Sequence, residues 1–276
     1  MNARRTTGVY FIAYPKTGST WLRFMLGCYL QEAHGLAEPP LFDDYDRLGR
    51  AIPVNRLPGI AFTHEPLTWQ SQTAGDLTFA NTVEPFRGKK IVLIVRYPLD
   101  AVLSHWHQMR TQARTPYEGD LVSFTDDPVF GLEKLLRFYS FWEEARSRGF
   151  GASPIRYEDI QEDPAGELSR ALDAIGVWPV DAGVLKRAAE RASFSSMKAM
   201  EESGDVPRYS SSGLPIFATG DRSDPNAFHV RQGKVGGYRS EYPAGVVPRF
   251  EQRIAEVMGG WYGYDSPPVA ERAVPA

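Results

Sequence analysis

A strand, a short loop and a helix follow one another near the start of the chain. The apolar run Val9 to Ala13 predicts a short buried strand, and Thr20 to Leu30 has the apolar spacing of a helix. In the loop between this strand and this helix, an anion would be bound by unpaired backbone N–H groups and by the positive end of the helix dipole. Gly18 lets the backbone approach such a ligand closely, and Lys16 adds a mobile positive charge. The loop is therefore predicted to bind an oxyanion.

The order of residues in this loop excludes a Walker A loop, which needs Gly-x-x-x-x-Gly-Lys followed by Ser or Thr. Here the lysine precedes the glycine. Residues Tyr14 to Trp21 resemble the 5′-phosphosulfate loop of sulfotransferases that use 3′-phosphoadenosine 5′-phosphosulfate (PAPS), whose pattern is Tyr-Pro-Lys-(Ser/Thr/Ala)-Gly-(Thr/Ser/Asn)-Thr-Trp. The resemblance implies donor-binding roles for Lys16, Thr17, Gly18, Ser19, Thr20 and Trp21, with the Trp21 ring against the purine. Taken alone, the loop also fits an ordinary strand–helix connection with an exposed lysine.

A second motif lies at the end of another buried strand. The run Ile91 to Val95 is apolar throughout, as in a strand of a parallel sheet covered on both faces, and Arg96 follows it. Ser104 stands two turns along the helix that Pro98 would begin, so the arginine and the serine can face one crevice and bind a second phosphate. The stretch resembles the family's 3′-phosphate motif, Arg-(Asn/Tyr/His)-Pro-x-Asp-x-x-x-Ser. A helix-capping arginine with a solvent-facing serine is the alternative.

The third motif is a basic, glycine-rich segment, Arg231 to Arg239. Three glycines and three cations in nine residues suit either a loop that wraps a phosphate or a surface turn. The family carries Arg-Lys-Gly-x-x-Gly-Asp-Trp-Lys here, and the resemblance implies that Arg231, Gln232 and Gly233 contact the 3′-phosphate. Gln232 departs from the lysine of that pattern.

A histidine at the end of a short predicted strand is the candidate base. The strand ends at Thr63-His64, where the family carries Lys-(Ser/Thr)-His. The resemblance implies that His64 takes the acceptor proton, a task to which its unperturbed pKa is suited. Phe62 replaces the usual lysine, which leaves Lys16 as the main catalytic cation near the transferring group. Glu65 is the alternative base, and a histidine with only a structural role is the other possibility.

Two further segments resemble the family's adenine contacts. Arg156 to Ile160 is similar to (Arg/Phe)-Tyr-Glu-Asp-Leu, which implies that Tyr157 borders the adenine. Ala192 to Met197 is similar to (Thr/Cys)-Ser-Phe-x-x-(Met/Leu), which implies contacts from Ser193 and Phe194.

The predicted elements alternate between strand and helix, which calls for a parallel sheet flanked by helices. We predict a P-loop-like α/β fold in a single domain over residues 1–276, because a 276-residue chain with 42% hydrophobic residues can bury one core. The expected strands are 8–13, 60–63, 90–95 and 153–157. The expected helices are 19–31, 98–112, 128–148, 164–175, 181–191 and 247–259.

Three segments between these elements are predicted to form the acceptor pocket and its lid, residues 36–58, 111–127 and 202–228. Long irregular segments in a compact domain often serve as lids. The candidate lining residues are Phe42, Tyr45, Trp69, Trp106 and Phe217. Plain packing is the alternative role for each of them.

Composition and charge limit the partners and the compartment. A net charge of −3 argues against nucleic acid as the main partner. The single cysteine, Cys28, cannot form an internal disulfide, which suits a reducing compartment. The apolar stretch that follows the first residues is too short for a signal peptide or a membrane span. We therefore expect a cytoplasmic protein with no transmembrane segment.

Together these motifs predict a PAPS-dependent sulfotransferase. It would move a sulfuryl group to a hydroxyl of a small-molecule acceptor, or as second choice to an amine, and release adenosine 3′,5′-bisphosphate (PAP). The family needs no metal, and none is expected here. Two alternatives stay open: a P-loop kinase acting on a nucleotide or small molecule, and a nucleotide-binding module without catalysis. The sequence indicates neither the identity of the acceptor nor the oligomeric state.

Overall fold

The computed structural model describes residues 7–42, 57–64, 71–208, 215–217 and 220–268. Across these residues, four parallel strands form one sheet in the order β2-β1-β3-β4. The strands are β1 (Thr7–Ala13), β2 (Gly59–Thr63), β3 (Lys90–Val95) and β4 (Ala152–Arg156). The predicted parallel sheet is confirmed, and each strand lies within one residue of its expected place.

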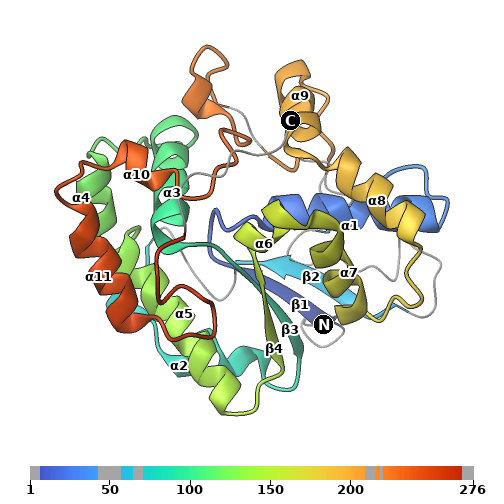
Figure 1. Cartoon of the computed structure of the whole chain (residues 1–276), viewed down its shortest axis with the longest axis horizontal. Helices are drawn as coiled ribbons and strands as arrows, with labels where there is room; N and C mark the ends of the chain where they lie inside the picture. Colours follow the sequence, from blue (N-terminus) through green and yellow to red (C-terminus); the bar gives the residue numbers. More distant parts are fainter. Residues whose placement is uncertain (1–6, 43–56, 65–70, 209–214, 218–219, 269–276) are drawn as a thin grey trace.

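Helices cover both faces of this sheet because the side chains of its central strands alternate between two cores. On β1, Tyr10 and Ile12 join one core, and Phe11 and Ala13 join the other. The helices over the first core are α3 (Pro98–Thr111), α5 (Leu132–Ser147) and α11 (Val247–Val257). Those over the second core are α1 (Ser19–Ala33), α7 (Pro164–Ala174) and α8 (Ala182–Arg191). Figure 1 shows the two helical layers on either side of the sheet.

Further elements lie between and beyond these helices. They are α2 (Phe79–Thr82), α4 (Leu121–Asp126), α6 (Tyr157–Glu162), α9 (Phe194–Ser203), α10 (Tyr238–Glu241) and the 3₁₀ turns Ala74–Asp76, Glu84–Phe86 and Pro225–Ala227. None of the helices within the described ranges is long and apolar enough to cross a membrane.

The start of α5 differs from its prediction. The helix begins at Leu132 and not at Pro128. The Asp127 carboxylate accepts hydrogen bonds from the amides of Val129 and Phe130, at 2.7 and 3.0 Å, and so holds a turn before the helix.

The segment 111–127, predicted as a lid loop, contains the helix α4. Asp120 caps this helix by accepting a hydrogen bond from the Ser123 amide at 2.7 Å. Leu121 and Phe124 are buried in the first core. Part of the segment is therefore packed structure and not loop.

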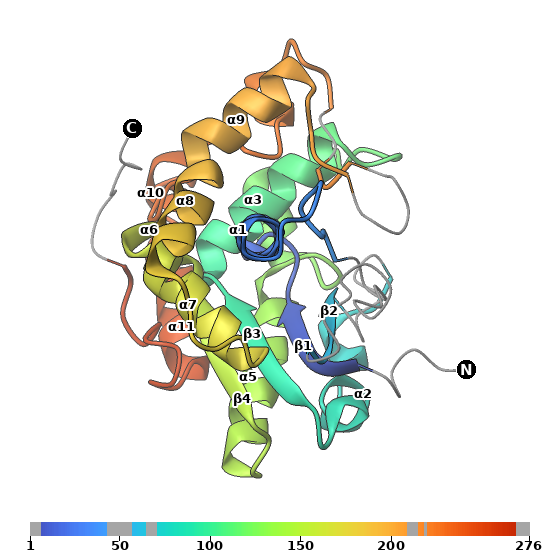
Figure 2. The ribbon, with the colours of Figure 1, turned by 90° about the vertical axis from the view of Figure 1, so that its right-hand side faces the viewer.

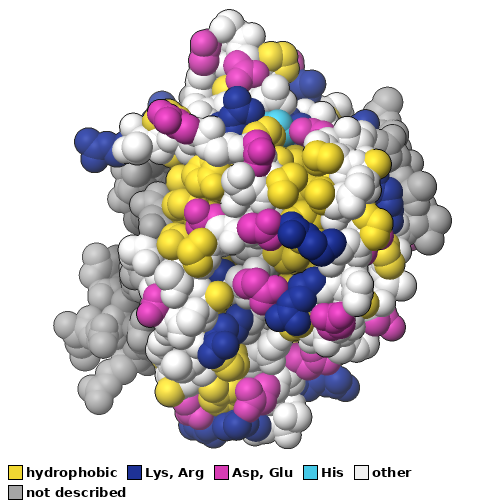
Figure 3. All heavy atoms as spheres, turned by 90° about the vertical axis from the view of Figure 1, so that its left-hand side faces the viewer, with side chains coloured by type: hydrophobic (Ala, Val, Ile, Leu, Met, Phe, Trp, Pro, Cys, Tyr) yellow, Lys and Arg dark blue, Asp and Glu magenta, His cyan; other side chains and the backbone are white. Residues whose placement is uncertain are grey.

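The outer face of α11 is tied to its neighbours by ion pairs. Arg249 contacts Asp126 at 2.8 Å, and Arg253 contacts Glu133 at 2.6 Å. Figure 3 shows acidic and basic side chains side by side on this part of the surface. Such exposed pairs contribute little stability each.

α1 and α3 both begin where a central strand ends. α1 follows β1 and α3 follows β3, and the two helices lie on opposite faces of the sheet. In Figure 2, α1 is seen end-on above the tip of β1, with α3 beside it and α9 above both. Open α/β sheets bind ligands at such a point, where connections leave neighbouring strands in opposite directions.

Candidate active site

A cleft opens at the carboxyl edge of the sheet, between the ends of β1 and β3. Its volume is about 190 Å³, whereas one water needs about 10–15 Å³ of such space. Its walls come from the loop after β1, the starts of α1 and α6, parts of α3 and α9, and the segment 229–238. His64 lines the cleft, as do most of the predicted donor-binding residues: Lys16, Gly18, Ser19, Thr20, Trp21, Arg96, Ser104, Tyr157, Phe194, Arg231, Gln232 and Gly233. The fold thus brings the three motifs and the candidate base to one place.

The loop after β1 has a backbone suited to an anion. Lys16 has a φ of 70°, uncommon for a residue with a side chain, and Gly18 has a φ of 101°. A Cβ atom on Gly18 would lie 2.7 Å from Cδ2 of Tyr157, so a larger residue would displace that ring. The Thr17 hydroxyl donates to the Tyr14 carbonyl oxygen at 2.9 Å and closes the loop, so this side chain does not line the cleft. α1 then begins with no acidic residue in its first turn, so its dipole favours an anion here.

Lys16 lies in a partly buried cluster of positive charge. Its Nζ is 3.4 Å from Nδ1 of His229. Burial, together with the charges of Arg96 and Arg231, lowers the pKa of Lys16 to about 7, against an opposing effect of Glu201. An anion bound in the cleft would favour the charged form of this lysine.

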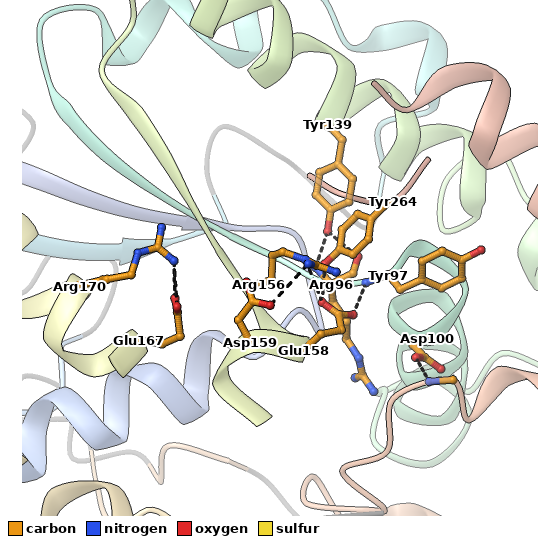
Figure 4. Close-up of polar contacts among 11 residues, drawn as sticks. Arg96, Tyr97, Asp100, Tyr139, Arg156, Glu158, Asp159, Glu167, Arg170 and Tyr264 are labelled. Atoms are coloured by element: carbon orange, nitrogen blue, oxygen red, sulfur yellow. Dashed lines mark hydrogen bonds and ion pairs between the residues drawn. The ribbon is translucent and has the colours of Figure 1, made fainter. Parts of the chain in front are cut away.

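Arg96 joins the two sides of the cleft. Its guanidinium lies over the Tyr157 ring, 4.1 Å from the centroid, and donates to the carbonyl oxygens of Lys234 (3.0 Å) and Lys16 (3.4 Å). Its Nε is buried and has no hydrogen-bond partner among the residues with described placement. The Tyr139 hydroxyl fixes the backbone of Arg96. It accepts a hydrogen bond from the Arg96 N–H at 3.0 Å and donates one to the Arg96 carbonyl oxygen at 3.1 Å (Figure 4).

Two buried carboxylates hold the segment 229–238 over the cleft. Asp100, in the first turn of α3, accepts hydrogen bonds from the amides of Gly236 (2.7 Å) and Tyr238 (3.0 Å). Figure 4 shows the Asp100 carboxylate directed at this backbone. Glu201 of α9 accepts from the amides of residues 229 and 230, at 2.7 and 2.8 Å. Segments far apart in the sequence therefore form one site.

Glu158 fixes the start of α6 and with it the neighbouring Tyr157. Its carboxylate accepts hydrogen bonds from the Tyr97 amide at 2.8 Å and from the Tyr264 hydroxyl at 2.5 Å (Figure 4). Burial raises the pKa of this carboxyl group. Tyr157 is thereby positioned between Gly18 and the guanidinium of Arg96.

His64 has a defined tautomer. Its Nδ1 lies 2.8 Å from the Ala13 carbonyl oxygen, which can only accept, so Nδ1 carries the proton and Nε2 can receive one. Burial lowers its pKa to about 4, and the charges of Arg23 and Lys16 act in the same direction, whereas the Ala13 carbonyl opposes them. The imidazole is therefore neutral near pH 7 and able to act as a base.

Phe62, at the position of the family's lysine, belongs to the second core. Its ring stacks on Phe11 at 4.4 Å and on Phe42 at 6.1 Å, and the Arg23 guanidinium lies 5.0 Å above it. Phe42 is buried by this stacking and does not line the cleft, although it was predicted to line the acceptor pocket.

Two other aromatic candidates for the acceptor pocket also lie outside the cleft. Trp106 packs beside the first core, and its indole N–H donates to the Gly119 carbonyl oxygen at 3.1 Å. Phe217 stacks on the His229 ring, with 5.5 Å between centroids, and so lies one layer behind the cleft. Tyr45, Glu65 and Trp69 fall outside the described residues.

Ser193 does not line the cleft either. It precedes α9 and caps it, because its hydroxyl accepts a hydrogen bond from the Ser196 amide at 3.3 Å. None of the described residues in the three predicted lid segments lines the cleft.

Sequence reasoning missed several residues that do line it. His229 lies in an irregular segment with no periodic pattern, and its position beside Arg231 was the only signal. Gln108, by contrast, is where helical spacing predicts it, on the same stripe of α3 as Ser104. Across the ranges that the structure describes, no group of three or more potential metal ligands occurs.

Proteins of known activity resemble this chain over most of its length. Flavonol 4′-sulfotransferase of Flaveria chlorifolia is 23% identical over 276 residues, which cover 92% of this chain and 80% of that protein. Sulfotransferase 1A1 of Bos taurus is 25% identical over 273 residues, covering 90% of this chain and 82% of that protein.

Solved structures show the same fold. Mouse sulfotransferase SULT7A1, complexed with PAP, matches with a TM-score of 0.60 and 20% identity, covering 93% of this chain and 86% of that chain. Retinol dehydratase, in complex with androsterone and PAP, matches with a TM-score of 0.62 and 15% identity, covering 94% and 82%. The model of the sulfotransferase domain family matches residues 7–262. The chain therefore belongs to the sulfotransferase domain family.

Proposed function

We propose that this protein transfers a sulfuryl group from PAPS to a hydroxyl group of a small-molecule acceptor. One observation carries the proposal: a single cleft contains the anion-binding loop with Lys16 and, from two other parts of the chain, Arg96 and Arg231. A nucleotide with phosphate groups at both its 5′ and 3′ positions needs two such cationic contacts. The solved relatives complexed with PAP support this choice of donor.

In this proposal the cleft residues divide into three groups. The 5′-phosphosulfate meets Lys16 and the first amides of α1, with Gly18, Ser19 and Thr20, and Thr17 contributes through its backbone. The 3′-phosphate meets Arg96, Ser104, Arg231, Gln232 and Gly233. The adenine lies near Trp21, Tyr157 and Phe194, with Ser193 fixing the start of α9.

His64 and Lys16 are the proposed catalytic residues. Nε2 of His64 takes the proton of the acceptor hydroxyl while the hydroxyl oxygen forms its bond to sulfur. The bond from sulfur to the bridging oxygen of the 5′-phosphate breaks, and PAP leaves with that electron pair. Lys16 and the loop amides stabilise the negative charge that develops on the bridging oxygen.

Two further expectations stay part of the proposal. We propose a single domain bordered by the segments 36–58, 111–127 and 202–228, of which 111–127 is partly helical. We also propose a cytoplasmic location, because similar proteins of Arabidopsis thaliana are named cytosolic sulfotransferases.

A kinase is the less suitable function because of the residue at the end of β3. A phosphotransferase of this fold would use an acidic side chain at such a strand end to hold magnesium. Here Arg96 stands there, and the nearby Asp100 carboxylate is engaged by two backbone amides.

Ligand binding and transfer test the donor directly. PAP at a hundred times its Kd should stabilise the fold by about 2.7 kcal/mol, and AMP at the same concentration should do far less because it lacks the 3′-phosphate. Equal thermal shifts for the two nucleotides would contradict the PAPS assignment. Transfer of labelled sulfate from PAPS to a panel of phenols and alcohols, with and without EDTA, distinguishes the sulfotransferase from a kinase and from a non-catalytic module.

A further inference from the structure

A carboxylate supports Arg231 from outside the cleft. Nη1 of Arg231 lies 2.6 Å from Oε1 of Glu241, in the short helix α10. The other carboxylate oxygen, Oε2, lies 2.8 Å from Nε2 of His107 on α3. Arg231 lines the cleft, whereas Glu241 and His107 do not.

This group differs from an ordinary surface ion pair. The Arg231 side chain is 12% exposed, that of His107 is 8% exposed and that of Glu241 is 24% exposed. Burial by itself would raise the pKa of Glu241, but the hydrogen bonds from His107 and Arg231 lower it to about 2. The carboxylate is therefore ionised throughout the neutral range, and a partly buried pair of this kind keeps its geometry better than an exposed one.

The backbone of the same segment is fixed by other residues. Asp100 holds the amides of Gly236 and Tyr238, and Glu201 holds the amides of residues 229 and 230. The Glu241 contact, by comparison, is made by the Arg231 side chain and not by its backbone. A free arginine has many rotamers, and restricting it before binding favours the bound state.

We propose that Glu241, supported by His107, is a positioning residue that holds Arg231 ready for the 3′-phosphate. It would thereby set the preference of the site for nucleotides with a 3′-phosphate over those without one. The inference rests on the proposed donor, since it assigns Arg231 to that phosphate.

The test compares PAP and AMP binding to the full-length protein by isothermal titration calorimetry. Glu241→Gln keeps the shape and loses the charge-assisted pair, so the Kd for PAP should rise ~3–10-fold while that for AMP stays within twofold. Removal of a negative charge would by itself tighten the binding of both anions, so a selective loss of PAP affinity cannot come from net charge. His107→Gln should give a smaller change of the same sign.

The matched control is Glu133→Gln, which removes another arginine–glutamate pair. Glu133 pairs with Arg253 at 2.6 Å, and neither residue lines the cleft, so this variant should leave both affinities within twofold. In an Arg231→Ala background, Glu241→Gln should have no further effect on PAP, because its action runs through the arginine.

Three results would overturn the inference: unchanged or tighter PAP binding in Glu241→Gln, equal loss for PAP and AMP, or the same loss with and without Arg231. Melting temperatures of all variants check that each is folded. If Glu241→Gln does not fold, His107→Gln provides the test. A wild-type protein that binds AMP as tightly as PAP would instead contradict the proposed donor.

Discussion

Lys16 combines a left-handed backbone with a weakened charge. Its φ of 70° directs the side chain into the cleft, where burial and neighbouring arginines lower its pKa to about 7. In the free protein the lysine is therefore close to half ionised at pH 7. On the proposed assignment of Lys16 to the 5′-phosphosulfate, the bound donor would supply negative charge beside the lysine and favour its ammonium form.

Proton uptake is the first prediction. At pH 8, where the PAP phosphates are already ionised, binding of PAP should take up close to one proton, because we expect the pKa of Lys16 to rise well above 8 in the complex. Calorimetry in buffers of different ionisation enthalpy measures this number. Lys16→Met should remove the uptake, and proton-neutral binding of PAP to the unmodified protein at pH 8 would contradict it.

The second prediction concerns the base. His64→Ala should lower turnover by ~10²–10⁴-fold and leave PAP affinity within a few-fold, since it removes the proton acceptor and not a donor contact. Because the pKa of His64 is about 4 in the free protein, kcat/KM should fall only as the pH approaches 4 and not near 6.5.

Two comparisons identify the base independently. Glu65→Gln should retain activity. If Glu65→Gln instead loses activity and His64→Ala keeps it, the base is the Glu65 carboxylate. An acceptor that is already ionised at assay pH, such as a nitrophenol, should partly rescue His64→Ala. A lack of rescue with lost PAP binding would show that His64 is structural.

At the scale of elements, the junction of β1 and α1 depends on the absence of a side chain at Gly18. Its φ of 101° is strained for any L residue, and a Cβ would meet the Tyr157 ring at 2.7 Å. Tyr157 in turn supports Arg96, so one methyl group would disturb two parts of the cleft.

Gly18→Ala is the third prediction. It should destabilise the fold by about 1–2 kcal/mol from the backbone alone and also weaken PAP binding at least ~10-fold, because the ring must move. Gly176→Ala is the matched control: its φ is 78°, nothing lies within 4 Å of its Cβ, and it does not line the cleft. Urea unfolding and calorimetry should show a similar backbone cost there with unchanged PAP affinity. An equal loss of affinity in both variants would refute the role of the Tyr157 contact.

The bounds of a helix or strand were predictable where a single local sequence pattern determines them. The apolar run of β3 and the proline at the start of α3 fix that junction without help from the rest of the chain. The start of α5 was not predictable, since the Asp127 side chain holds a turn that periodicity does not reveal. α4 is only six residues long, too short for a helical period to emerge.

In the site, too, some residues were predictable from local patterns and others were not. Lys16, Arg96 and Arg231 line one cleft, and all three could be predicted from local motifs. Lys16 and Arg96 each follow a strand, and Arg231 lies in the basic, glycine-rich segment. The contact of Glu241 with His107 joins residues 134 positions apart, and no local pattern encodes it. Phe42 packs against Phe62 and not in the cleft, because an aromatic side chain in a loop finds packing partners as readily as a ligand.

At the scale of the whole molecule, buried neutral histidines link stability to pH. Burial lowers the pKa of His105 to about 3 and of His64 to about 4, and that of His229 lies well below its usual value. In the unfolded chain these groups titrate near 6.5, so below that pH the unfolded state binds more protons.

The fourth prediction is a loss of stability on mild acidification. The free energy of unfolding should be highest above pH 6.5 and fall between pH 6.5 and 5, by up to about 1.4 kcal/mol per pH unit for each histidine. Asp100 and Glu158, whose pKa values are raised by burial, act in the opposite sense and reduce this slope. Urea unfolding at several pH values gives the slope, and His105→Gln should reduce it. A flat profile that His105→Gln leaves unchanged would contradict this role of the histidines.

The assembly of the cleft from distant parts of the chain has a consequence for biosynthesis. The loop at residues 15–21 and all four described strands are complete once residue 156 has been synthesised, but the segment 229–238 is made much later. Translation proceeds from the N-terminus, so a nascent chain can fold its sheet while the roof of the cleft is still missing. Only after Asp100 and Glu201 have captured that segment is Arg231 in place in the cleft. On the proposed assignment of Arg231 to the 3′-phosphate, a nascent chain that still lacks this segment cannot hold both phosphates of the nucleotide.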